Sequence, residues 1–187
     1  FELINLQEQL GVTFVVVTHD QEEAMTLASR IGVMNKGQIV QVGTPTDIYE
    51  FPNSRFVADF IGNVNLMEGQ LSVDEPDHVV IDCADCQHYV GHGITGTAGM
   101  AVSVALRPEK ITIHRTPVEG ANVLAGEIKD LAYFGKDSLY RVALPSGALV
   151  SVHAVNAARA SDDERLADWY DKVWLSFDPA SVLLLTD

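Results

Sequence analysis

The sequence predicts an α/β segment over residues 1–62, followed by an all-β barrel over residues 63–187. Two observations lead to this fold class. An apolar, mostly β-branched run at Thr13–Thr18 passes directly into a helix with its own start signals, as in strand–helix units. After Gly62 the helical patterns give way to short strand patterns, broken by Gly, Pro and Asp about every 10 residues, which is typical of a small closed sheet.

The first element is a predicted helix over Glu2–Leu10, because three leucines fall on one helical face. Gly11 is placed to end this helix in the left-handed conformation. The run Thr13–Thr18 does not alternate between apolar and polar residues, which favours a strand buried on both faces of a parallel sheet. A second helix is expected to start at Asp20 as its cap, with Glu23 at the spacing of a capping box and apolar residues continuing at helical spacing.

His19 falls between the predicted strand and the predicted helix. This places it at the carboxyl end of a central strand and beside the positive end of a helix. Open α/β sheets bind ligands in that crevice, and helix N-termini favour anions such as phosphate. The alternative is a strand-end histidine that is hydrogen-bonded to the backbone.

The rest of the α/β segment is predicted to hold a hairpin and two short helices. Ile31–Met34 and Gln38–Val42 read as strands, and Gly37 supplies the positive φ that their turn needs. Thr44 is the expected cap of the next helix, and a last helix follows Pro52.

Nine strands are predicted in the second segment from their apolar content and the turn residues between them. They are Leu66–Val73, His78–Cys83, Ala101–Arg107, Lys110–His114, Val123–Leu131, Ser138–Leu144, Leu149–His153, Lys172–Phe177 and Ser181–Leu185.

The composition excludes several function classes. A net charge of -14, from 26 acidic and 12 basic residues, repels nucleic-acid phosphates and argues against a nucleic-acid-binding barrel. Two cysteines make no disulfide framework, so a reduced, cytoplasmic setting is expected. No apolar run approaches the roughly 20 residues of a membrane span, so any membrane role is expected to run through a partner. Because Phe1 is not an initiator Met, we expect the chain to be part of a longer one.

Residues 17–62, VTHDQEEAMTLASRIGVMNKGQIVQVGTPTDIYEFPNSRFVADFIG, closely resemble the last third of the ATP-binding subunit of ABC importers. The resemblance runs from the histidine switch loop to the end of the nucleotide-binding domain. It implies that residues 1–62 are the C-terminal piece of that domain. It also implies that His19 is the switch histidine, which reaches the γ-phosphate of ATP and helps to hold the attacking water.

The second segment is similar to the TOBE domain of the same importers, an OB-like barrel. The similarity lies in LRPEKITI, GEIKDLAYFGKDSLYRVALPSGALVSV and DKVWLSFDPASVLLL. It implies a five-stranded regulatory barrel over residues 63–187, partly assembled from strands on either side of the core repeat, that pairs with its copy in a second subunit. The sequence around Leu106–Glu109 and Ala132–Gly135 is most similar to that of polyamine importers, especially the putrescine type.

These resemblances imply ATP and Mg as cofactors of the parent protein, with none bound tightly to this chain. The implied partners are a second ATPase subunit, the membrane permease subunits and, indirectly, a periplasmic substrate-binding protein, at the cytoplasmic side of the inner membrane. The chain has no GxxxxGK[ST] phosphate loop, no LSGGQ signature and no aliphatic run ending in Asp-Glu. We therefore expect that it does not hydrolyse ATP alone.

Four residues in the second segment have metal-ligand chemistry: Cys83, Cys86, His88 and His92 form C-x2-C-x-H-x3-H. Their types suit tetrahedral Zn²⁺. His88 follows Cys86 too closely for the usual second pair, however, and the expected outcome is a loop with incidental thiols and no metal site.

Two further patterns have a functional and a plain interpretation. Residues 162–164, Asp-Asp-Glu, suit Ca²⁺ or a polyamine, but a charge run is usually a solvated face. Trp169, Tyr170 and Trp174 suit a cation-binding aromatic surface, and packing in the core or at a subunit interface is the favoured interpretation.

The leading hypothesis leaves two alternatives open. One is a ligand-sensing barrel, because relatives of this barrel bind oxyanions such as molybdate, and a polyamine is the other candidate ligand. The second is an ABC importer subunit for another substrate, such as iron(III) or a sugar.

Overall fold

The computed structural model describes residues 2–91, 96–156 and 165–186. The chain divides into two compact units, Phe1–Asn63 and Val64–Asp187, and each is described on its own. No helix in these ranges is long and apolar enough to cross a membrane.

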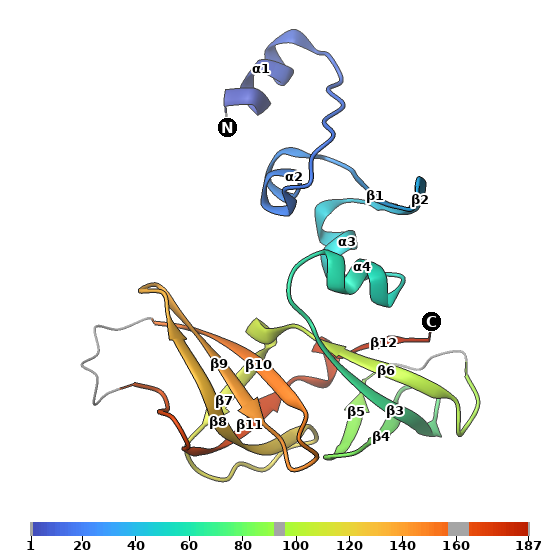
Figure 1. Cartoon of the computed structure of the whole chain (residues 1–187). Helices are drawn as coiled ribbons and strands as arrows, with labels where there is room; N and C mark the ends of the chain where they lie inside the picture. Colours follow the sequence, from blue (N-terminus) through green and yellow to red (C-terminus); the bar gives the residue numbers. More distant parts are fainter. Residues whose placement is uncertain (1, 92–95, 157–164, 187) are drawn as a thin grey trace. The chain divides into compact units, whose positions relative to one another are not determined.

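The first unit begins with helix α1 (Glu2–Leu10; Figure 1). None of the side chains of α1 is buried. Gly11 ends it as predicted, with a φ of 63° and its N–H donating to the carbonyl oxygen of Gln7 at 2.9 Å. The apolar face of α1 is therefore present but packs on nothing in this part of the chain.

The predicted strand at Thr13–Thr18 is wrong for this chain. The segment is extended, yet it pairs with no strand in the ranges that the structure describes, and its side chains are exposed, up to 96% for Val17. A strand that is buried on both faces depends on neighbouring strands to satisfy its backbone groups. Without them the β-branched residues keep an extended backbone and gain no sheet.

Helix α2 (Gln21–Leu27) follows with the predicted cap: the Asp20 side chain accepts a hydrogen bond from the Glu23 N–H at 3.0 Å. The helix ends at Leu27, short of the apolar periodicity that runs on to Ile31. Ile31 instead starts a strand, so helical spacing across the boundary was misleading.

The predicted hairpin is confirmed. Strands β1 (Ile31–Asn35) and β2 (Gln38–Gly43) pair antiparallel, and both Lys36 and Gly37 in the turn have positive φ. This is the backbone that a two-residue turn needs to match the twist of its strands.

Two short helices complete the first unit. Thr44 and Asp47 form a reciprocal capping box at the start of α3 (Pro45–Glu50), and Ser54 caps α4 (Arg55–Phe60). A small core holds these elements together; it consists of Ile31, Val33, Ile48, Val57 and Ile61.

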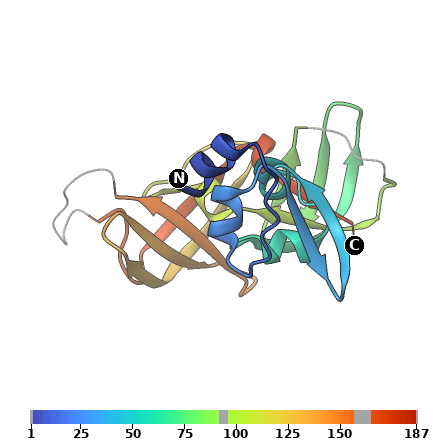
Figure 2. The ribbon, with the colours of Figure 1, turned by 90° about the horizontal axis from the view of Figure 1, so that it is seen from above.

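The second unit consists of two five-stranded antiparallel sheets (Figures 1 and 2). The first, in spatial order, contains β12 (Leu183–Leu185), β6 (Ala101–Leu106), β3 (Asn65–Asp74), β4 (Val79–Cys83) and β5 (Gln87–Val90). The second contains β10 (Leu149–Val155), β9 (Asp137–Ala143), β8 (Val123–Tyr133), β11 (Lys172–Phe177) and β7 (Ile111–His114).

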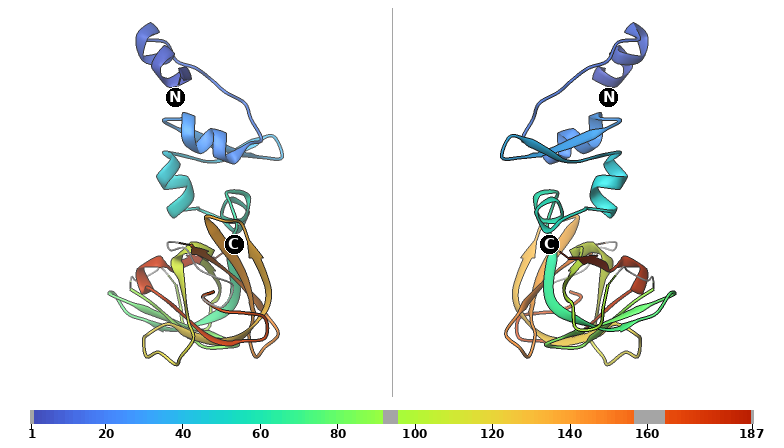
Figure 3. Two further views of the ribbon diagram at one scale, coloured as in Figure 1. Left: turned by 90° about the vertical axis from the view of Figure 1, so that its left-hand side faces the viewer. Right: turned by 90° about the vertical axis from the view of Figure 1, so that its right-hand side faces the viewer.

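The second of these sheets curls towards closure, as Figure 3 shows. Its end strands β10 and β7 approach each other, and β10 also lies against the 3₁₀ turn Pro108–Lys110. A five-stranded sheet whose ends approach in this way is an OB-like barrel. The predicted fold class is confirmed.

All nine predicted strands form with small changes at their ends, but β5 was not predicted. Its sequence, Gln87-His88-Tyr89-Val90, contains two polar residues and follows a turn, so it resembles a loop. It pairs with β4, with Ile81 opposite His88.

Asparagines tie the two sheets together in a reciprocal way. Asn65, at the start of β3, bonds through both polar side-chain atoms to the backbone of Ser151 on β10, an end strand of the other sheet. Asn122, just before β8, does the same to Tyr89 on β5, an end strand of the first sheet. Each asparagine thus bonds the backbone of one residue on an end strand of the opposite sheet. One hydrophobic core, including Ile81, Val104 and Leu124, runs through the unit.

Candidate functional site

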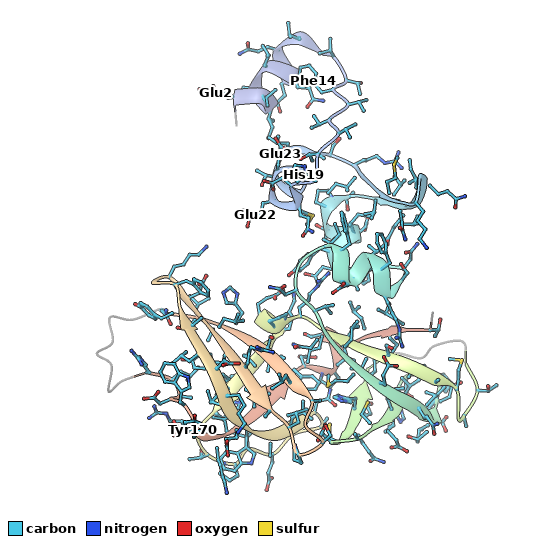
Figure 4. All side chains as sticks on the ribbon, viewed as in Figure 1. Glu2, Phe14, His19, Glu22, Glu23 and Tyr170 are labelled. Carbon is cyan, nitrogen blue, oxygen red and sulfur yellow. The ribbon has the colours of Figure 1, made fainter. Side chains whose placement is uncertain are left out.

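His19 lies in the last turn of chain before α2, with Glu22 and Glu23 on the helix beside it (Figure 4). The residue is exposed, and no hydrogen bond or ion pair joins its ring to another residue that the structure describes. Among the described residues, no strand precedes His19, and no hydrogen bond joins its ring to the backbone.

The surroundings of His19 are acidic. Asp20, Glu22 and Glu23 fall within four residues of it. Negatively charged carboxylates so near in the sequence repel a phosphate group at His19. A single imidazole among these carboxylates does not form a nucleotide site by itself. A site that uses His19 needs further groups from outside the first unit.

The residues of the C-x2-C-x-H-x3-H pattern come partly together. Cys86 Sγ lies 3.6 Å from Nε2 of His88, and the His88 ring stacks on Phe177 with 5.5 Å between ring centroids. Cys83 is the residue opposite Cys86 in the same hairpin. His92 lies outside the described residues.

Burial controls the protonation of this cluster. Desolvation raises the pKa of the Cys83 thiol to about 11 and that of Cys86 to about 12, with smaller contributions from nearby carboxylates. Desolvation also lowers the pKa of His88 to about 4, so the ring is neutral at pH 7. Among the described residues, no group of three side chains is arranged to hold a metal ion.

The aromatic residues near the C-terminus are not in the core. Trp169 is 46% exposed, and Tyr170, which is labelled in Figure 4, is 72% exposed. The Lys129 ammonium sits 5.7 Å from the centroid of the Tyr170 ring. Trp174 is half-buried. Packing within the unit, part of the favoured interpretation, is wrong for the first two. The acidic residues 162–164 fall outside the described ranges.

A surface pocket that sequence reasoning did not find lies where β8, β11 and the β9–β10 turn meet. Its volume is about 390 Å³. Its lining combines apolar and charged side chains from distant parts of the chain: Ala125, Gly126, Glu127, Lys129, Ala143, Leu144, Pro145, Lys172, Val173 and Trp174. No local pattern could have predicted it, since only the strand order brings these residues together.

Comparison with known proteins places both units in context. The family model described as TOBE domain matches residues 104–185. The putrescine transport ATP-binding protein PotG of Escherichia coli (strain K12) is 43% identical over 188 residues, which cover 99% of this chain and 49% of that protein. The spermidine/putrescine import ATP-binding protein PotA of Rubrobacter xylanophilus is 40% identical, covering 86% of this chain and 42% of its own length. PotA of Thermobifida fusca is also 40% identical, with 95% and 46% covered.

A solved structure resembles part of the chain. The cytoplasmic molybdate-binding protein ModG superposes with a TM-score of 0.58 and 14% identity, covering 66% of this chain and 96% of that chain. At this identity the likeness supports the OB-like fold alone. The chain spans about half the length of the curated relatives that it matches. The chain thus carries a TOBE domain match and is similar, along 86–99% of its length, to the ATP-binding proteins of putrescine and spermidine/putrescine transport.

Proposed function

We propose that the chain is part of the ATP-hydrolysing subunit of an ABC importer for polyamines, of the putrescine or spermidine type. The observation that carries the proposal is the 43% identity to the putrescine transport ATP-binding protein over 99% of this chain. Both units take part in that alignment, so the proposal does not depend on the barrel alone.

In this proposal, residues 1–62 are the C-terminal piece of the nucleotide-binding domain, and residues 63–187 are the regulatory and dimerisation barrel. The complete subunit uses ATP and Mg and pairs with a second copy. It works beneath permease subunits at the cytoplasmic side of the inner membrane and receives polyamine indirectly from a periplasmic binding protein.

His19 is proposed to contact the γ-phosphate of ATP when two subunits close on the nucleotide. Its exposed ring supports this role, since no described residue of the first unit bonds to the ring and a nucleotide could reach it. The extended run before it, Thr13–Thr18, would then be a strand of the nucleotide-binding sheet, held by neighbours that this chain does not supply. Held in this way, the ring would face the mouth of the sheet.

This chain alone is proposed not to hydrolyse ATP. Hydrolysis needs a phosphate loop, Mg²⁺ ligands and a carboxylate that positions water, and the sequence has none of the corresponding motifs. The direct test is an ATPase assay of the purified chain with Mg²⁺, with His19→Ala as the control. Turnover that depends on His19 would refute the proposal.

The substrate is tested separately, in a complete transporter whose ATPase subunit contains this chain. We expect uptake of labelled putrescine or spermidine that stops without the subunit. Uptake of iron(III) or a sugar instead would leave the importer assignment standing and overturn the polyamine assignment.

The pocket of about 390 Å³ favours one second candidate function, a ligand-sensing barrel. On its wall Lys129 is ion-paired with Glu127, and Lys172 adds a second positive charge, so the net charge suits an oxyanion better than a polyamine cation. Calorimetric titration of the chain with molybdate and with putrescine separates the two hypotheses. Heat from a stoichiometric complex would support the sensor, whereas the importer role requires neither ligand to bind here.

A further inference from the structure

Two thiols face each other across the hairpin of β4 and β5. The ladder pairs Asp82 with Gln87, and the next bond outward runs from the Cys83 N–H to the carbonyl oxygen of Cys86 at 3.1 Å. Cys83 and Cys86 are thus directly opposite, separated by a two-residue turn. Hydrogen-bonded cross-strand partners have Cα atoms about 5.5 Å apart. Disulfides form at Cα separations of about 4.4–6.8 Å.

Both thiols point to the same side of the hairpin. Side chains alternate along a strand, so Cys83 shares its face with the buried Ile81, and Cys86 shares its face with the buried His88. Neither cysteine is in a disulfide, and both pack against the edge of the core while remaining half-exposed. The Cys86 sulfur also lies 3.6 Å from Nε2 of His88. A small oxidant therefore has access to a pair that is already aligned.

The turn between them is anchored. Asp85 accepts hydrogen bonds from the backbone N–H and the hydroxyl of Ser146, at 2.8 and 2.6 Å, on the β9–β10 turn of the other sheet. On β3, opposite Cys83, stands Gly69, where an added Cβ would lie 2.6 Å from the Cys83 sulfur. The glycine leaves room for the sulfur, and the Asp85 contact holds the turn that presents both thiols.

We propose that Cys83 and Cys86 are a reversible dithiol–disulfide site, oxidised by low-molecular-weight organic disulfides. In the first step a cysteine thiolate attacks the organic disulfide, forms a mixed disulfide and releases one thiol. The second cysteine, as thiolate, then attacks the protein sulfur of that mixed disulfide, and the Cys83–Cys86 bond forms as the second thiol leaves. The two protons of the cysteines end on the two released thiols, and the organic disulfide is reduced by two electrons.

Burial and nearby carboxylates set the speed of these steps. Desolvation raises the pKa of both thiols, and Asp82, Asp85 and Glu68 raise that of Cys83 further. Either thiolate can make the first attack, and the other then resolves the mixed disulfide. Because both thiols are protonated at pH 7, oxidation should be slow there and speed up about tenfold per pH unit.

The experiment treats the reduced chain with glutathione disulfide at pH 7.5 and 8.5, blocks remaining thiols with N-ethylmaleimide and measures the intact mass. We expect a product lighter by two hydrogens, with no maleimide and no glutathione attached, which dithiothreitol returns to two free thiols. Cys83→Ser and Cys86→Ser are the matched controls, and each should stop at a glutathione adduct. Two unreacted thiols, or glutathione retained on the wild-type chain, would overturn the proposal.

Discussion

The side-chain amide of Asn122 binds both backbone polar atoms of Tyr89: Nδ2 donates to the carbonyl oxygen at 2.8 Å, and Oδ1 accepts the N–H at 2.6 Å. Tyr89 belongs to β5, whose outer edge carries no further strand of its sheet in the described chain. The amide therefore takes the place of a neighbouring strand. Asn65 does the same for Ser151 on β10, so each buried amide satisfies the backbone N–H and carbonyl of one residue on an end strand.

Replacing Asn122 by alanine should lower the free energy of unfolding by about 2 kcal/mol, because two hydrogen bonds are lost and two backbone groups are left without partners. Urea unfolding followed by circular dichroism measures the change. Glu119→Gln, an exposed substitution three residues away, is the control and should change little. Equal stability of the Asn122 variant and this control would show that the amide does not hold the edge.

Gly126→Ala should destabilise the barrel by about 2 kcal/mol through overpacking. An added Cβ would lie 2.5 Å from Cγ1 of Val142 and 2.7 Å from the carbonyl oxygen of Ala143, and backbone cannot easily move away. Gly120→Ala is the matched control, because its Cβ would meet only Val123 at 3.5 Å. The melting temperatures of the two variants should differ clearly; similar values would contradict the close strand approach at Gly126.

His88 should make the second unit less stable in acid. Its pKa falls from 6.5 to about 4 on burial, so between these values the unfolded chain holds a proton that the folded chain lacks. Stability is thus fully present above pH 6.5 and is lost as the pH falls towards 4, by about 3 kcal/mol in total.

The measurement compares wild type with His88→Gln, which cannot titrate, by urea unfolding at pH 7 and pH 4. Carboxylates titrate alike in both proteins and cancel in the difference. The wild type should lose more stability than the variant over this interval, and parallel losses would mean that His88 is accessible to protons when folded.

His19→Ala separates structure from function. In this chain the exposed ring makes no contact with the described residues, so the unfolding free energy should change by less than about 0.5 kcal/mol. In a complete ATPase subunit that contains the chain, hydrolysis should fall about 100-fold while ATP binding is kept. Unchanged turnover there would remove His19 from the mechanism.

Local signals predicted local structure well. The caps at Asp20 and Thr44 and the positive φ of Gly11 and Gly37 are all confirmed, because each depends on only a few neighbouring residues. Strand β5 was missed because its polar residues resemble those of a loop. His88 is buried in the strand only because its ring stacks on Phe177, which comes from a distant strand.

Thr13–Thr18 failed for a different reason. Its β-branched residues favour a β-strand, but a sheet forms only when several strands pair. Without pairing strands, the segment stays an extended chain. The same limit applies to His19, whose role depends on groups that its own segment does not hold. The asparagine hydrogen bonds could not be predicted either, because they join residues that are 33 and 86 positions apart in the sequence. The pocket could not be predicted because its lining strands come together only in the folded chain.

The uncovered stretch from Val12 to Thr18 has a practical consequence for anyone handling the protein. It is uncharged, rich in β-branched residues and free of proline, with Val15 and Val17 almost fully in water. Short segments of this composition stack into cross-β fibrils when they are accessible. We therefore expect these seven residues to limit how long the purified chain stays free of aggregates, whatever the stability of the barrel. The substitution Val16→Lys should lengthen that time.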